Sequence, residues 1–256
     1  MLSPMLSLGD YPVLGSLLFL AIGVVMGSFG TVLVSRLPQG RTILGRSQCP
    51  RCGKTLGPAE LVPLLSFAVQ GGRCRSCESR IPWLYPIVEA FSALLFLLAF
   101  LRQGMWVLPG LALGVVLWLF LLVTIMDAQT GFISDYLSFP FLVLSVVYAL
   151  FFPPLPIIAP LIGAGFFAAQ WAGSRGKWVG SGDIIIGAGM GFLLRDWRLL
   201  VIALFLAYII GALTALVLIL FKKKTIKDRL AFVPFLFVAT LITLIAGYDI
   251  LDFYIF

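Results

Sequence analysis

The sequence contains no histidine, and only 11% of its 256 residues are charged. The absence of histidine excludes every mechanism that needs an imidazole, including Ser–His–Asp triads, Ser–His dyads, HExxH zinc proteases and histidine proton relays. The low charge excludes an ordinary soluble globule, in which about a quarter of the residues are charged. The remaining candidates for chemistry are a few carboxylates and four cysteines.

Apolar residues make up 61% of the chain, and the mean hydropathy is +1.09. In lipid a helix satisfies its own backbone hydrogen bonds, and about 20 apolar residues cross the hydrocarbon core. The sequence therefore predicts an all-α polytopic membrane bundle of about eight transmembrane helices. The predicted helices cover residues 12–34, 83–101, 105–126, 136–152, 157–173, 183–194, 199–221 and 231–249. The first run lacks a preceding basic segment and is long for a cleaved signal, which predicts a retained helix.

The basic residues predict the orientation of this bundle. If the eight helices alternate in direction, three loops (35–82, 174–182 and 222–230) lie on one side and hold 15 of the 18 Lys and Arg residues. The positive-inside rule makes that side cytoplasmic, with both termini outside. The net charge of +7 is then explained by topology and by contact with anionic lipid headgroups, so a nucleic-acid partner is not needed.

All four cysteines lie in the 35–82 loop, as two CxxC pairs separated by 21 residues: Cys49, Cys52, Cys74 and Cys77. This spacing favours one tetrahedral zinc with four thiolate ligands over two disulfides or free thiols, because the cytoplasm is reducing. Four sulfur ligands leave no position open for water, so the predicted zinc is structural. The cytoplasmic loop is thus expected to be zinc-binding.

Two acids lie at the edges of apolar segments, Asp127 after the third and Asp183 within Gly180-Ser181-Gly182-Asp183. Alternation puts both at cytoplasmic helix ends, although 56 residues separate them. An acid at membrane depth is costly and is a functional-site hypothesis, and two can activate a water between them. The pair predicts an aspartic protease at the membrane surface. The other interpretation is that Asp183 only caps a helix.

Two further acids have simpler interpretations. Asp135, eight residues after Asp127, is expected to be a helix cap. Glu89 lies inside the second apolar segment and needs a partner there. That partner is either a basic loop residue or a second site, and the sequence does not separate the two.

Taken together, the motifs resemble those of the type IV prepilin peptidases, and the resemblance covers essentially the whole chain. The matching segments are Gly27-Ser28-Phe29, Ser35-Arg36-Leu37-Pro38, Cys49–Gly53, Gly72–Cys77, Tyr85-Pro86-Ile87-Val88-Glu89, Ile125-Met126-Asp127, Gly180–Asp183 and Val233-Pro234-Phe235. Two positions depart from the family pattern. Gln129 and Ile185 stand where the family usually has an acid and a lysine.

The resemblance implies a bacterial inner-membrane enzyme that removes the basic leader of type IV prepilins or type II secretion pseudopilins at the cytoplasmic face. It makes Asp127 and Asp183 the catalytic pair. It also implies N-methylation of the new N-terminal residue with S-adenosylmethionine, although no glycine-rich fingerprint for that donor is visible. The expected organisation is a methyltransferase part over 1–102, including the cysteine loop, and a peptidase domain over 103–256.

Three other functions fit parts of the pattern. A presenilin-like GxGD protease would share the acids, but the four-cysteine loop favours the prepilin peptidases. A transporter would place polar residues in the middle of several helices, whereas these acids lie near helix ends. A non-catalytic scaffold whose zinc loop docks a partner would keep its function when either aspartate is mutated.

Overall fold

The computed structural model describes residue 8 and residues 11–221 and 230–255. Over these residues the fold is all-α, as predicted, and its only extended pairing is two isolated bridges, Gln48–Thr55 and Arg73–Arg80. The helices are α1 (Pro12–Arg36), α2 (Leu65–Val69), α3 (Leu84–Arg102), α4 (Val107–Thr130), α5 (Asp135–Leu150), α6 (Ile158–Ser174), α7 (Ser181–Leu194), α8 (Trp197–Leu220) and α9 (Val233–Ile255), with 3₁₀ turns η1 (Leu37–Gln39) and η2 (Pro58–Glu60).

All eight predicted apolar helices are present. The largest shift is at the end of α9, predicted at residue 249 and found at Ile255. The short helix α2, inside the cysteine loop, was not predicted. Within the described residues, five segments are long and apolar enough to cross a membrane: Pro12–Gln39, Leu84–Arg102, Val107–Thr130, Trp197–Leu220 and Val233–Phe253, while α5 and α7 are shorter.

The exposed surface of α8 explains why the bundle needs lipid. In its most apolar stretch of 18 residues, only 22% of the residues are buried inside the protein. Large apolar side chains such as Val201, Phe205, Leu213 and Leu220 are exposed along it. Contact with water would be unfavourable for such a surface, whereas hydrocarbon tails solvate it.

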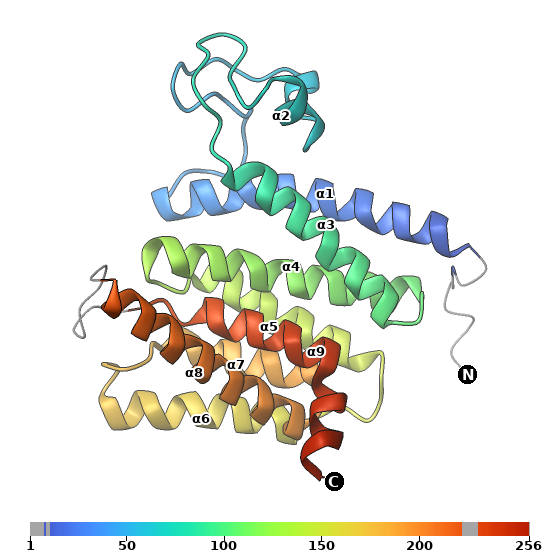
Figure 1. The fold of residues 1–256 in the computed structure, drawn as a ribbon, viewed down its shortest axis with the longest axis vertical. Helices are drawn as coiled ribbons and strands as arrows, with labels where there is room; N and C mark the ends of the chain where they lie inside the picture. Colours follow the sequence, from blue (N-terminus) through green and yellow to red (C-terminus); the bar gives the residue numbers. More distant parts are fainter. Residues whose placement is uncertain (1–7, 9–10, 222–229, 256) are drawn as a thin grey trace. The chain divides into compact units, whose positions relative to one another are not determined.

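The chain forms two compact units, residues 1–118 and 119–256, and the division falls inside α4. In the first unit α1 packs on α3 through glycines. A Cβ on Gly27 would lie 2.6 Å from the Glu89 Cα, and one on Gly23 would lie 2.6 Å from the Ala93 Cα. Small residues let helix backbones approach closely in a membrane. The 37–83 loop extends from the joined ends of these two helices (Figure 1).

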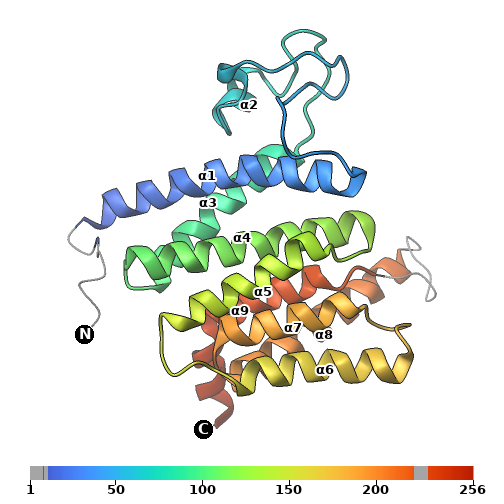
Figure 2. The same ribbon diagram turned by 180° about the vertical axis from the view of Figure 1, so that it is seen from behind.

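In the second unit the end of α4 is part of the core. The Phe120 ring packs on Phe141 of α5 and Phe237 of α9, with centroids 4.8 and 5.3 Å away. Helices α6 and α7 lie side by side (Figure 2), and a Cβ on Gly163 would overlap the Gly187 carbonyl. This packing holds the start of α7, and therefore Asp183, within the helical core.

Candidate active site and metal centre

Asp127 lies in the last turn of α4 and is 5% exposed. Its Oδ2 accepts a hydrogen bond from the backbone N–H of Val233 at 3.0 Å. Val233 is the first residue of α9, so the carboxylate satisfies one of the unpaired N–H groups at that helix start. This contact fixes the orientation of a buried charge without using a basic side chain.

Asp183 is held in a similar way by its own turn. It is the third residue of α7 and 6% exposed, and its Oδ2 accepts from the backbone N–H of Gly180 at 2.9 Å. Its Oδ1 is also buried and has no hydrogen-bond partner among the described residues. A buried carboxylate oxygen without a partner is costly, which is characteristic of an atom that meets a ligand or a water.

The glycines around Asp183 have separate roles. Gly180 is the N-cap residue, and its N–H is the donor to the carboxylate. Gly182 faces Ile133 in the connection after α4, and a Cβ there would lie 2.8 Å from the Ile133 Cβ. The motif therefore brings the start of α7 against the segment that follows Asp127.

In the second unit Asp183 lies within electrostatic range of Asp127. Beside Asp127 lies a cavity of about 360 Å³. Its other lining residues are small or apolar: Ala128, Gly131, Leu230, Ala231, Pro234 and Phe235. Two buried carboxylates that share a site can hold a water and share a proton.

Asp135 is the remaining acid near this site, and Gln129 and Ile185 are the two positions that depart from the family pattern. Asp135 is exposed and is the first residue of α5, while Ser134 occupies the N-cap position, so the predicted capping role of Asp135 is wrong. As an acid in the first helical turn it still interacts favourably with the helix dipole. Gln129 is exposed and Ile185 is half-buried.

Two polar residues of the second unit were missed from the sequence. Tyr208 on α8 lies within electrostatic range of Asp183. Its hydroxyl donates to Oε1 of Gln170 on α6 at 2.8 Å. The available signal was a glutamine and a tyrosine within apolar helices, where polar groups pair with one another.

In the first unit the four cysteine sulfurs lie within 4.8 Å of one another, and all four thiols are free. Each CxxC pair forms the same tight turn. Cys49 and Cys74 donate their N–H groups to the carbonyls of Lys54 and Ser79, at 2.9 and 3.0 Å. The repeated turn points two thiols from each knuckle at one centre.

The distances suit a zinc ion. Zn–S bonds of about 2.3 Å in a tetrahedron give S···S distances of about 3.8 Å. The Cys49 and Cys77 sulfurs lie 3.8 Å apart. Hydrogen bonds from the backbone N–H groups of Cys52 and Arg51 lower the pKa of the Cys49 thiol to about 6. The Ser79 hydroxyl, 3.1 Å from Cys77 Sγ, lowers the pKa of that thiol. The lowered pKa values of Cys49 and Cys77 favour the thiolate form that binds metal. The pKa of Cys52 is raised to about 11: a backbone hydrogen bond from Lys54 lowers it, but desolvation and the neighbouring thiols outweigh that effect.

Glu89 is buried on α3, and no basic side chain among the described residues forms an ion pair with it. Its Oε2 accepts from the backbone N–H of Leu64, in the cysteine loop, at 2.8 Å. One of the two predicted alternatives paired Glu89 with a basic side chain of the loop. In the structure the loop supplies the backbone amide of Leu64 as the partner instead. The basic residues predicted at 222–230 lie outside the described residues.

Comparison with known proteins gives matches over both parts of the chain. The family profile "Bacterial Peptidase A24 N-terminal domain" matches residues 21–103, and "Type IV leader peptidase family" matches residues 114–216. A protein of Bacillus subtilis named "Prepilin leader peptidase/N-methyltransferase" is 35% identical, with 94% of this chain and 97% of that protein covered.

Proteins with the same name from Pseudomonas aeruginosa and Aeromonas salmonicida are 28% and 29% identical. The matches cover 97% and 94% of this chain, and 96% and 93% of those proteins. No solved structure matches the chain significantly. The similarity to the Bacillus protein extends over nearly the full length of both chains, and the predicted resemblance is confirmed: the chain belongs to the type IV leader peptidase family.

Proposed function

We propose that this chain is a GxGD-type aspartic endopeptidase of the bacterial inner membrane. Its substrates are type IV prepilins or type II secretion pseudopilins, whose basic leader it removes at the cytoplasmic face. The observation that carries the proposal is the pair of buried carboxylates Asp127 and Asp183, each with one oxygen held by a backbone N–H. The names of the full-length relatives support the substrate class.

The reaction needs one ionised and one protonated carboxyl. The ionised group takes a proton from water, which attacks the scissile carbonyl, while the protonated group donates a hydrogen bond to the carbonyl oxygen. The backbone donors hold Oδ2 of each acid. Asp183 Oδ1 has no hydrogen-bond partner among the described residues and is available to water or substrate. The two acids titrate as a pair, so neither role belongs to one residue.

The positions of the two acids support a peptidase over a transporter. Asp127 lies at the end of α4 and Asp183 at the start of α7. The acids of an ion path are expected in the middle of the membrane helices.

We assign a structural zinc to Cys49, Cys52, Cys74 and Cys77. The ion would tie the two knuckles together and close the loop between them, and four thiolates leave it no open position for catalysis. The proposed sidedness follows from the basic residues of this loop, which favour the cytoplasm, with both termini outside.

We further propose that the chain N-methylates the residue exposed by cleavage, with S-adenosylmethionine as donor. The relatives' name supports this second activity. In the proposed organisation residues 1–102 carry methyl transfer and residues 103–256 carry peptide cleavage. The donor supplies an activated methyl group bound to a sulfonium.

The test is co-expression with a prepilin, followed by the mass of the pilin N-terminus. The proposal expects a product that lacks its leader and carries one added methyl group. A matched control is the same prepilin expressed without the enzyme. A product that keeps its leader would refute the peptidase, and a cleaved product without the methyl group would refute the second activity alone.

A further inference from the structure

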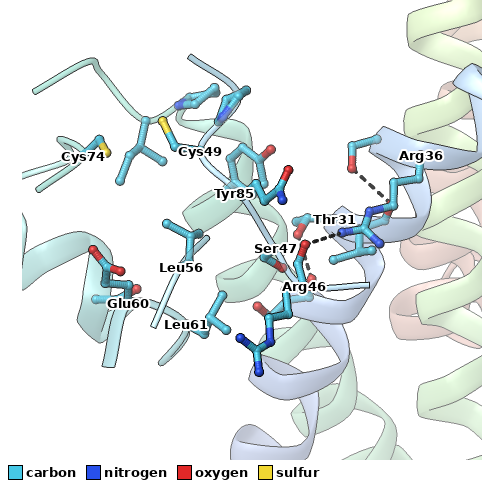
Figure 3. A pocket seen from close by; sticks show the side chains of 18 of the residues that line it. Thr31, Arg36, Arg46, Ser47, Cys49, Leu56, Glu60, Leu61, Cys74 and Tyr85 are labelled. Carbon is cyan, nitrogen blue, oxygen red and sulfur yellow. Dashed lines mark hydrogen bonds between the residues drawn. The ribbon is translucent and has the colours of Figure 1, made fainter. Parts of the chain in front are cut away.

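A cavity of about 970 Å³ lies in the first unit, between the cysteine loop and the ends of α1 and α3. This volume is at the upper end of the range of about 300–1,000 Å³ for small-molecule sites. Figure 3 shows its wall, with Thr31 and Arg36 on α1, Tyr85 on α3, and Arg46, Leu56 and Glu60 on the loop. The proposed peptidase acids do not line it.

Glu89 lines the same cavity on the helix side. It lies five residues after Leu84, the start of α3, or about 7.5 Å along the axis at 1.5 Å per residue. The contact of Gly27 with the Glu89 backbone and the hydrogen bond from Leu64 N–H hold it in place. The side chain of Ser28 lies beside the carboxylate. An acid fixed just inside the end of a membrane helix, with no ion-pair partner in the described part of the chain, is by default a functional-site hypothesis.

The loop side of the cavity is rich in cations. The Arg36 guanidinium donates to the carbonyls of Thr42, Ile43, Leu44 and Arg46, and so shapes the 42–46 segment. Glu60 is paired with Lys54 at 3.7 Å. Arg41, Arg46 and Arg80 also line the cavity and form no ion pair within the described part of the chain. A ligand with a carboxylate is favoured at this wall.

The two sides of the cavity therefore differ in charge: a carboxylate at the helix end, and arginines on the loop. A methyl donor that carries a carboxylate suits the loop side. The new N-terminus of a cleaved pilin is an ammonium at the end of an apolar membrane helix, which brings it to the helix side. Methyl transfer also needs this amine in its neutral form.

We propose that this cavity is the methyl-transfer site and that Glu89 is a catalytic residue, binding the substrate's N-terminal ammonium and accepting one of its protons. The inference rests on the methyltransferase activity proposed above. The freed nitrogen lone pair forms a bond to the methyl carbon of the donor. The carbon–sulfur bond breaks, and its electron pair stays on the sulfur, which becomes a neutral thioether. The product is a methylated ammonium, and Glu89 returns its proton to water.

The main variant is Glu89→Gln in the full-length, zinc-loaded enzyme. The amide oxygen of glutamine still accepts the Leu64 N–H, but the side chain neither takes a proton nor carries charge. Methylation of a pre-cleaved pilin should fall by about 100-fold or more, the usual contribution of a general base. Leader cleavage, zinc content and calorimetric binding of S-adenosylmethionine should stay as in the wild type.

The matched control is Glu78→Gln, which removes an exposed carboxylate of the same loop that does not line the cavity. This variant should methylate at the wild-type rate. A second measurement needs no variant. Wild-type enzyme should bind a free-amine pilin peptide more tightly than its N-acetylated form, and Glu89→Gln should lose that preference.

Wild-type methylation by Glu89→Gln would overturn the proposal. So would equal binding of the free-amine and acetylated peptides to the wild-type enzyme. A parallel loss of cleavage, zinc and methylation in Glu89→Gln would show that Glu89 only holds the loop. If the wild-type enzyme cleaves but never methylates, the proposed second activity fails, and the Glu89 inference fails with it. That result differs from methylation that persists in the variant.

Discussion

The Asp127 carboxylate accepts a hydrogen bond from the backbone amide of Val233 at 3.0 Å, across 106 residues of sequence. The contact joins the end of α4 to the start of α9 and orients one acid of the proposed pair. The Gly180 amide likewise donates a hydrogen bond to the Asp183 carboxylate, at 2.9 Å, and orients the other acid of the pair. Each acid therefore has both a structural role, in satisfying a helix start, and a proposed chemical one.

These two roles can be separated with isosteric amides. Asp127→Asn and Asp183→Asn keep an oxygen that accepts from Val233 or Gly180, so both proteins should insert and fold. Neither amide carries the charge or the exchangeable carboxyl proton that the reaction needs. Leader cleavage should fall by on the order of 10²–10⁴-fold or more in each variant, because the pair acts as a unit. N-terminal mass of a co-expressed prepilin measures it. Normal processing by either well-expressed variant would refute the pair.

Asp135→Asn is the control for those variants. Asp135 is exposed at the first position of α5 and is not the N-cap residue. Its loss removes only a favourable contact with the helix dipole, so unfolding free energy should change by about 0.3–1 kcal/mol. Cleavage should continue near the wild-type rate. Loss of cleavage in this variant would show that the catalytic acids have been assigned incorrectly.

The four sulfurs predict about one zinc per chain in purified protein, measured by metal analysis. Serine at Cys49, Cys52, Cys74 or Cys77 should lower the metal content and make the 37–83 loop more sensitive to proteolysis. Protein from zinc-replete cells that contains no zinc would contradict the assignment.

Ser79→Ala tests whether the Ser79 hydroxyl stabilises the zinc site, and it removes no zinc ligand. The Ser79 hydroxyl lowers the pKa of Cys77, so the native thiolate persists to lower pH. Without it the Cys77 pKa should rise, and protons should displace zinc at a higher pH on acidification. Zinc affinity should fall by about 10–100-fold, as when other outer partners of metal ligands are lost. An unchanged pH of zinc release would contradict this role.

Gly27→Ala should destabilise the first unit although alanine favours helices. The new Cβ would lie 2.6 Å from the Glu89 Cα, so α1 and α3 must separate, at a cost of about 1–3 kcal/mol. Gly165→Ala in α6 is the matched control, since no atom lies within 4 Å of its added Cβ. Thermal unfolding in detergent measures both. A lower melting temperature is expected for Gly27→Ala alone, and equal behaviour of the two variants would contradict close packing at Gly27.

The sequence alone determined the local features of this protein. Apolar runs between charges predicted all eight apolar helices because each run satisfies its own backbone within the membrane. The CxxC spacing predicted the two knuckles, since each turn is made by neighbouring residues. Family membership followed from short motifs that also depend only on local order.

The tertiary structure decided which distant groups meet. Asp183 lies within electrostatic range of Asp127 because the end of α4 and the start of α7 belong to one core. Glu89 meets the Leu64 amide, not a basic side chain, because the loop folds back on α3. The cavity at Glu89 and the contact of Tyr208 with Gln170 were likewise absent from the sequence patterns. Such contacts join residues that are far apart along the chain, and the packing of the helices determines them. Hydrophobic periodicity and motif spacing, in contrast, report on local structure.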